Sequence, residues 1–149
     1  MISLRYMIDH LHHHTAHVSQ VFPVDTDLTC TLTALNTANT FSTWAEIADS
    51  GATKLSTAFA TSVGHISAML VETISETDTI YILEVSWGAD KTVLLRSRFA
   101  GGTKFQSPAT HTKFNAPWFP AGQLIYYRMK TATAVADTCT VHFRYHVHG

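Results

Sequence analysis

The spacing of apolar residues changes along this chain. From residue 25 onward apolar and polar residues alternate, as in Leu28-Thr-Cys-Thr-Leu-Thr-Ala34, where threonine occupies every second position. Successive side chains of a β-strand point to opposite faces of a sheet, so this alternation predicts a strand with one buried and one solvated face. The pattern is clearest in residues 138–148, where one side carries Cys139, Val141, Phe143, Tyr145 and Val147.

Other segments follow the same alternation and are bounded by turn residues. We expect further strands at about residues 43–48, 65–74, 79–87, 92–99 and 123–130. Longer loops are expected at residues 49–64, which are small and polar, and 103–119, which carry two prolines. About seven or eight short strands with almost no helix predict an all-β fold, with a single antiparallel β-sandwich or jelly-roll-like domain over residues 25–149.

Residues 1–24 do not share this alternation. Their apolar residues have a weak helical spacing, and Pro23 then interrupts the segment. We therefore expect an N-terminal arm or short helix outside the sandwich, with apolar side chains that are buried only against another chain. The arm residues expected to bind such a partner are Leu4, Tyr6, Met7, Ile8 and Leu11.

Composition argues against several classes of function. Of the 149 residues, 46% are hydrophobic, only 14% are charged and 22 are threonine, which suits a half-solvated sheet. A formal net charge of −1 gives no reason to expect a nucleic-acid or membrane partner. No apolar run approaches the ~18 residues that a membrane helix needs. The first residues lack the basic and apolar regions of a secretory signal.

Two cysteines, Cys30 and Cys139, are far apart in the sequence and form no CxxC motif. A zinc ribbon or a redox motif is therefore not expected. Both residues fall on the expected inward sides of strands. Buried free thiols are the favoured interpretation, and a disulfide that joins the first strand to the last is the alternative.

Three segments occur in a fixed order: residues 36–47 (NTANTFSTWAEI), 119–129 (FPAGQLIYYRM) and 138–147 (TCTVHFRYHV). The middle segment is an aromatic-Pro-Ala-Gly turn that leads into an alternating strand. This arrangement resembles small β-sandwich structural proteins of tailed bacteriophages, which include capsid decoration (cement) proteins and tail or fibre accessory domains. The resemblance covers about residues 28–149 and leaves the arm outside.

The resemblance implies a virion structural protein without an active site or cofactor. It implies a capsid decoration protein, located on the capsid surface and assembled in the host cytoplasm, that stabilises the head by clamping neighbouring capsid subunits. The expected partners are the major capsid protein and further copies of the chain, in a dimer or trimer. The alternatives are a tail, baseplate or fibre accessory domain, and a carbohydrate-binding module with Trp118, Phe119, Tyr126 and Tyr127 as its platform.

The sequence contains no motif of catalysis that we can assign. The HExxH and GxSxG patterns and a glycine-rich phosphate loop are all missing. The carboxylates are spread over expected strand edges and turns. Any sandwich offers accidental pairs of facing acids, so these residues do not indicate a glycosidase. We therefore expect neither catalytic residues nor enzymatic activity.

Histidines gather near both ends of the chain. In a helical arm His10, His13, His14 and His17 would share one face, and in the last strand His146 and His148 share a side. Either spacing can bind a divalent metal. The favoured interpretation is nevertheless solvated or interface histidines, which are neutral at pH 7 and hydrogen-bond readily.

Two further pairs are candidates for partner binding. Arg96 and Arg98 point outward together from an expected strand. With Lys91 and Lys104 they form a basic strip, which is either a solvated face or a docking surface for an acidic partner. Trp118 and Phe119 lie in the long loop between two prolines. They either close the end of the sandwich or anchor an interface. Trp44 and Trp87 are expected in the core.

Overall fold

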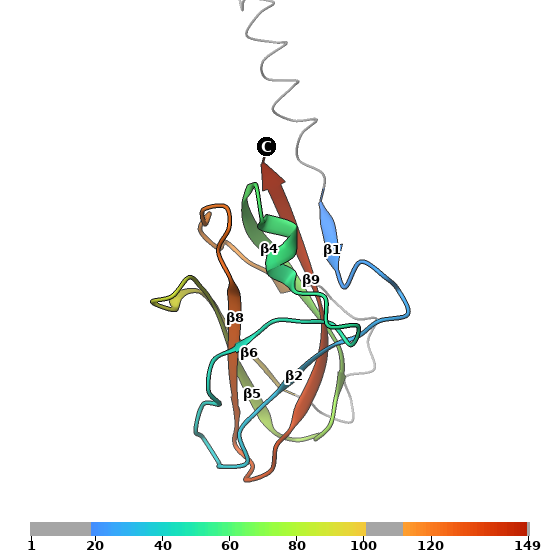
Figure 1. The fold of residues 1–149 in the computed structure, drawn as a ribbon. Coiled ribbons are helices and arrows are strands. Elements are labelled where there is room, and N and C mark those ends of the chain that lie inside the picture. The colour runs from blue at the N-terminus through green and yellow to red at the C-terminus, as the bar shows by residue number, and fades with distance from the viewer. Residues whose placement is uncertain (1–18, 101–111, 149) are drawn as a thin grey trace, which may run out of the picture.

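The computed structural model describes residues 19–100 and 112–148, and these form two antiparallel β-sheets that face each other (Figure 1). The all-β, sandwich-like fold expected from the alternation is confirmed. In the described ranges the single helical element is a 3-10 turn, η1 (Leu55–Phe59), and no helix there has the length and apolar character to cross a membrane.

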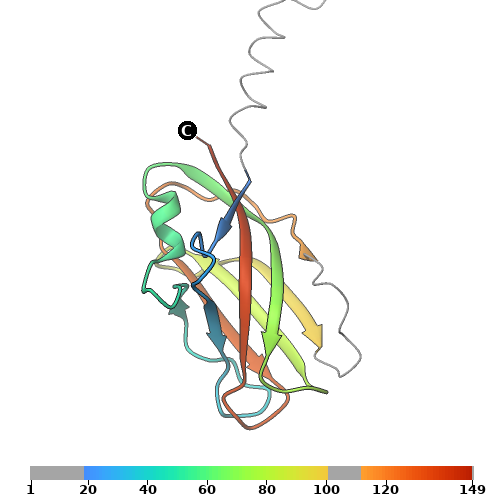
Figure 2. The same cartoon turned by 90° about the vertical axis from the view of Figure 1, so that its right-hand side faces the viewer.

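The first sheet is built around the last strand. It contains β1 (Gln20–Phe22), β2 (Cys30–Thr33), β4 (Val63–Ile74), β7 (Thr112–Lys113) and β9 (Thr138–His148). Strand β9 pairs with β4 on one side and with both β1 and β2 on the other. Figure 2 shows β9 and β4 in front, with the second sheet behind them.

The second sheet has the order β3-β8-β5-β6. Its strands are β3 (Ala45–Glu46), β5 (Ile80–Trp87), β6 (Thr92–Ala100) and β8 (Ile125–Thr131). The segment before β3 continues along β8 as an irregular edge. There the Asn39 amide donates to the Thr131 carbonyl at 2.7 Å, and the Ser42 amide donates to the Met129 carbonyl at 2.9 Å.

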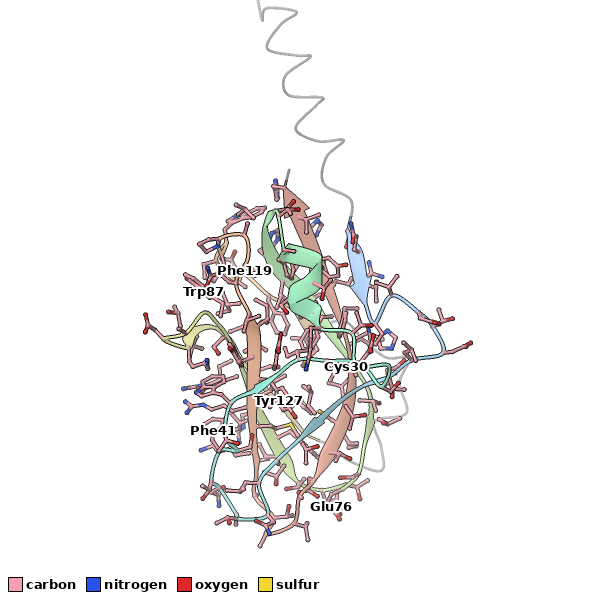
Figure 3. All side chains as sticks on the ribbon, in the orientation of Figure 1. Cys30, Phe41, Glu76, Trp87, Phe119 and Tyr127 are labelled. Carbon is pink, nitrogen blue, oxygen red and sulfur yellow. The ribbon has the colours of Figure 1, made fainter. Side chains whose placement is uncertain are left out.

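The core lies between the sheets, as alternation requires. Inward residues of the first sheet, such as Phe143, meet inward residues of the second, such as Leu83 and Met129. Phe119 and Tyr127 also lie between the layers (Figure 3). Each residue that alternates with these points out of the sandwich, so the two outer faces carry the polar side chains.

Both cysteines are buried in this core as free thiols, which agrees with the favoured interpretation. Burial raises the pKa of Cys30 to about 12, helped by the neighbouring Cys139 and Asp49. Burial alone raises the pKa of Cys139 to about 12. At neutral pH both side chains therefore act as small apolar residues.

The chain packs most closely at Gly64, near one end of the sandwich. A Cβ atom there would lie 2.3 Å from ring atoms of Phe59 and 2.8 Å from the carbonyl oxygen of His146. Gly64 also exchanges backbone hydrogen bonds with Phe119, which brings the loop after β7 onto the edge of β4. A glycine is required here because two layers and a crossing loop meet without room for a side chain.

Three local expectations need correction. The sandwich begins before residue 25, because β1 pairs with β9 and Phe22 is buried in the core. Residues 49–64 are not entirely loop, since they contain η1. The alternation in β6 also shifts at a bulge, which turns Leu94 inward and leaves Val93 exposed.

The two tryptophans expected in the core are less buried than predicted. Trp44 and Trp87 are only partly buried, not fully enclosed in the core. Trp44 lies outside the second sheet, against the guanidinium of Arg128. Trp87 packs at the margin of the core from the end of β5.

Candidate functional site: the outer face of the second sheet

Basic side chains gather on the outer face of the second sheet. We call this surface the cationic face and define it by the side chains that project outward from β5, β6 and β8 and by the adjoining turns. It carries five of the chain's ten lysines and arginines. These are Lys91, Arg96, Arg98, Arg128 and Lys130.

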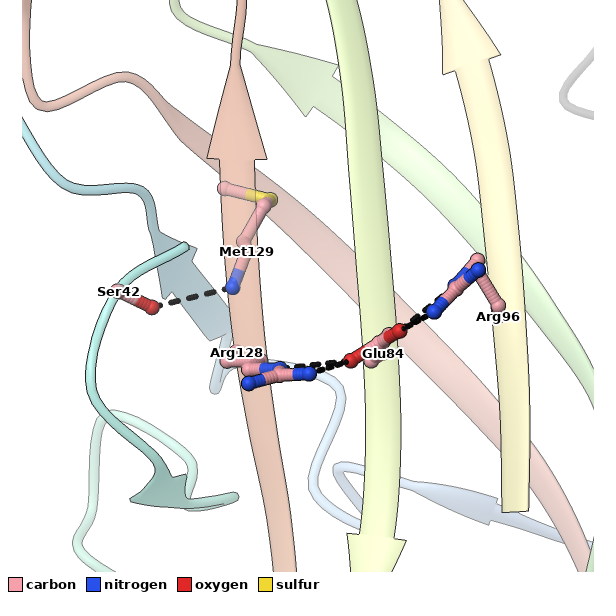
Figure 4. A network of polar contacts seen from close by, with 5 residues as sticks. All are labelled: Ser42, Glu84, Arg96, Arg128 and Met129. Carbon is pink, nitrogen blue, oxygen red and sulfur yellow. Dashed lines mark hydrogen bonds and ion pairs between the residues drawn. The ribbon is translucent and has the colours of Figure 1, made fainter. Parts of the chain in front are cut away.

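Strand register explains why these residues meet. Glu84 on the central strand β5 is paired with Arg96 of β6 on one side and with Arg128 of β8 on the other. Residues directly opposite in an antiparallel sheet have side chains on the same face, close enough to interact. The row Arg96–Glu84–Arg128 therefore crosses three strands (Figure 4).

Glu84 is bound by both arginines. Arg96 donates from Nε to Oε1 of Glu84 at 2.6 Å and also contacts that oxygen through Nη2. Arg128 donates to Oε2 through Nε and Nη2, both at 2.6 Å. The carboxylate side chain is 0% exposed, whereas the side chains of Arg96 and Arg128 are 66% and 31% exposed. The arginines thus cover the acid and present their own charge to solvent.

The electrostatics of this row favour the ionised acid. Desolvation by burial acts to raise the pKa of Glu84, but the hydrogen bonds and positive charges of Arg96 and Arg128 outweigh it, so the pKa lies below its ordinary value. Two arginines share one carboxylate. The row therefore keeps a net positive charge at neutral pH.

Aromatic rings lie beside the cations. The guanidinium carbon of Arg128 is 4.4 Å from the centroid of the Phe41 ring and 4.5 Å from that of Trp44. The ammonium group of Lys130 is 4.8 Å from the Phe41 centroid. These rings are held in place by the irregular edge along β8, where Ser42 Oγ accepts a 3.1 Å hydrogen bond from the Met129 amide (Figure 4). Cation–π attraction fixes the orientation of the basic groups.

A third ring lies near the turn between β5 and β6. The ammonium group of Lys91 is 3.4 Å from the centroid of Tyr126, which projects from β8. The same ammonium group donates to the Gly88 carbonyl at 3.3 Å. The cationic face thus combines flat apolar rings with oriented positive charges, which suits an anionic group that also offers apolar surface.

The row next to Glu84 holds a pocket. Ile82 of β5 is paired with Arg98 on one side and Lys130 on the other. The pocket has a volume of about 140 Å³. Its lining consists of Asn39, Ile80, Ile82, Arg98, Lys130, Thr131 and Ala132.

The outer face of the first sheet is different. At one end the Trp118 ring lies 4.3 Å from His65 and 3.8 Å from His148, measured between centroids. The ring of His146 stacks on that of His65 at 4.9 Å. Among residues 19–100 and 112–148, no group of three or more His, Cys, Asp or Glu residues is arranged to hold a metal ion. We therefore describe these histidines as an aromatic stack around Trp118.

The structure separates several residues that the sequence analysis had grouped. Trp118 is 47% exposed while Phe119 is 1% exposed, so Phe119 closes the end of the core and only Trp118 is available at the surface. The suggested sugar platform is not assembled, because Tyr127 is buried as well and Tyr126 lies on the opposite sheet from Trp118. Phe119 is accordingly a core residue and not a partner-binding residue.

The remaining candidates fall in two groups. Arg96 and Arg98 are exposed on the outer face of the second sheet, as expected. The other group lies outside the described residues and comprises Leu4, Tyr6, Met7, Ile8, Leu11, His10, His13, His14 and His17.

Sequence reasoning missed the part of the cationic face that β8 contributes. Arg128 and Lys130 were placed in an expected strand but were not connected with Arg96 and Arg98. The available signal was the alternation within residues 125–131, where Tyr126, Arg128 and Lys130 share the side opposite the buried residues. Nothing in that alternation indicates which strand lies next to β8.

No protein-family model, no curated protein and no solved structure matches this chain.

Proposed function

We propose that this chain is a structural docking protein of a tailed-phage particle, a capsid decoration protein whose cationic face binds an acidic surface of neighbouring capsid subunits. The observation that carries the proposal is the collection of half of the chain's basic residues, with three aromatic rings, on one face of one sheet. The formal net charge of the whole chain is only −1, so this concentration of positive charge on one face is a local feature.

The chemistry of this face suits protein docking. A guanidinium carries five N–H donors, so Arg96 and Arg128 retain donors beyond those that contact Glu84. Arginine and aromatic residues are enriched at the centres of protein interfaces, where they supply rigid contact area. Complementary charge increases the association rate and fixes the orientation of binding, and both effects weaken as salt is added.

The proposal includes a second contact through the N-terminal arm. Strand β1, the first described strand, pairs with β9, and the proposed arm precedes it in the sequence. Under the proposal, the arm and the cationic face contact different subunits, and self-association into a dimer or trimer increases the number of such contacts. Binding at several linked contacts raises the overall affinity without strengthening any one of them.

The experiment compares two triple variants with the same change in net charge. One carries Lys91→Gln, Arg98→Gln and Lys130→Gln on the cationic face. The other carries Lys54→Gln, Lys113→Gln and Arg144→Gln elsewhere. Each protein is sedimented with capsids that lack it, at low and high salt.

We expect the first triple variant to lose at least about tenfold in capsid affinity at low salt, because three modest charged contacts are removed together. The second should bind like wild type. Equal losses in both variants would show that only overall charge matters and would contradict the proposal. If wild type does not bind capsids, the capsid proposal fails, and isolated tails and glycans are the next partners to assay.

A further inference from the structure

Two neighbouring rows of the cationic face differ in one respect. In the first, two arginines flank Glu84. In the second row, Arg98 and Lys130 flank Ile82, which is the next residue of β5 on the same face as Glu84. Both rows cross β6, β5 and β8, but only the first contains a carboxylate. Within the described part of the chain, no acidic side chain forms an ion pair with Arg98 or Lys130.

The pocket lies over this second row. Its floor is aliphatic, formed by Ile80 and Ile82, and its basic groups come from β6 and β8 on either side. Asn39 also lines the pocket. The pocket has a volume of about 140 Å³. That space accommodates one carboxylate on a short hydrocarbon stem.

We infer that this pocket, between Arg98 and Lys130, binds one side-chain carboxylate from an acidic segment of a partner protein. The inference rests on the proposed function and specifies the chemistry of its contact. The incoming carboxylate occupies the position over Ile82 that corresponds to that of Glu84 in the next row. Its oxygens accept hydrogen bonds from the two basic groups, and its stem covers the isoleucines.

The floor of the pocket favours a carboxylate over a phosphate. A phosphate group has oxygens on every side and loses hydration where it faces an aliphatic surface, whereas the stem of a glutamate side chain is itself aliphatic. Nucleic acid would also contact the face mainly through phosphates, without a preference for this pocket over the other cations. Binding to an oligonucleotide is therefore an outcome of the test that argues against the inference.

The decisive variant supplies the missing carboxylate from within the chain. Ile82→Glu places an acid between Arg98 and Lys130 in the register that Glu84 occupies between its two arginines. Ile82→Gln is the matched control, with the same size and no charge. The probe is a fluorescein-labelled peptide of ten glutamates, followed by fluorescence anisotropy at low ionic strength, and the competitor is an unlabelled ten-nucleotide thymidine oligomer.

Wild type and Ile82→Gln should bind the peptide with affinities within about threefold of each other, and Ile82→Glu should lose at least tenfold. The inference would be overturned if Ile82→Glu and Ile82→Gln bound the peptide with equal affinity, whether both bound like wild type or both had lost affinity. So would an oligonucleotide that displaces the peptide at lower concentration than unlabelled peptide does. If Ile82→Glu fails to fold, the pair Arg98→Gln with Lys130→Gln is compared with Lys113→Gln with Arg144→Gln. Unchanged peptide binding in the first pair then overturns the inference.

The outcome separates this inference from the proposed function. Peptide binding that depends on the pocket, without capsid binding, supports the carboxylate site and contradicts the capsid role. Capsid binding that is equal for Ile82→Glu and Ile82→Gln supports the capsid role and overturns the pocket as its contact.

Discussion

The outer faces of the two sheets differ although both belong to one sandwich. On the first sheet, threonines such as Thr73 and Thr140 face each other, with a hydrogen bond of 2.5 Å between their hydroxyls, and histidine rings stack at one end. On the second sheet, arginines and lysines surround a carboxylate that is 0% exposed. These hydroxyl and ring contacts of the first face stay within the sheet, whereas the second face orients charge toward solvent.

One glutamate on each sheet illustrates the difference between the two outer faces. Glu72 on the first sheet is 38% exposed and lies 3.2 Å from His142 Nε2. Glu84 on the second sheet is fully covered by two arginines. Both are outward residues of strands, but only Glu84 is buried, and its charge there is stabilised by two arginines.

The largest effect of substitution should come from the inner side of the first sheet. We expect Gly64→Ala to lower the free energy of unfolding by about 3 kcal/mol, because its Cβ would overlap the Phe59 ring and approach a backbone oxygen. Chemical denaturation with urea measures this. Gly51→Ala is the control, since its nearest neighbour would be the flexible Leu28 side chain at 3.1 Å. If Gly64→Ala lost less unfolding free energy than Gly51→Ala, the packing at Gly64 would not be as restrictive as we expect, and this end of the sandwich could expand.

The next largest effect should distinguish the two glutamates. Glu84→Gln should cost about 2 kcal/mol of stability, because it removes the charge that two arginines share, and their exposure moderates the cost of a broken buried pair. Glu72→Gln should cost at most about 0.5 kcal/mol, as expected for an exposed pair. Equal losses in urea denaturation would mean that the two outer faces do not differ energetically.

The contribution of Glu84 to folding stability should depend on pH. The pKa of Glu84 is lowered in the folded protein, so its contribution is fully present above the unfolded-state value of 4.5 and is lost as pH falls through the folded-state value. The stability advantage of wild type over Glu84→Gln should therefore be constant from pH 7 to about pH 5 and shrink below that. Urea denaturation of both proteins at a series of pH values tests this. An advantage that grows in acid would contradict the assignment.

Trp118→Ala should have a smaller effect on stability than Glu84→Gln. Trp118 contacts the rings of His65 and His148 but is 47% exposed, so we expect a loss of at most about 1 kcal/mol in stability. Binding of the glutamate peptide at the opposite sheet should not change. Weaker peptide binding in this variant would show that the two faces are not independent.

The alternation of apolar and polar residues predicted the long strands well, but it did not predict short strands or bulges that depend on pairing with other strands. Thr138–His148 forms β9 with the expected bounds, because its inward residues are uninterrupted and large. Strand β1 was missed, since three residues followed by Pro23 give too short a pattern, and it is stabilised by tertiary pairing with β9. The bulge at Leu94 was also outside the reach of a period of two.

The cationic face was half predicted for a related reason. Arg96 and Arg98 were recognised because they alternate within one strand. Their association with Arg128 and Lys130 depends on β5 lying between β6 and β8, a pairing of distant segments that no local pattern specifies. The burial of Glu84 follows from the same pairing, so its partners were invisible to local reasoning.

Under the proposed function the cationic face, and not the first sheet, is the docking surface. Lysine acetylation followed by mass spectrometry tests it directly, with the protein free and bound to capsids. Lys91 and Lys130 lie on the cationic face, and Lys113 is exposed on the first sheet. We expect binding to slow the acetylation of Lys91 and Lys130 at least fivefold and to leave that of Lys113 unchanged. Protection of Lys113 with continued reaction at Lys91 and Lys130 would contradict it.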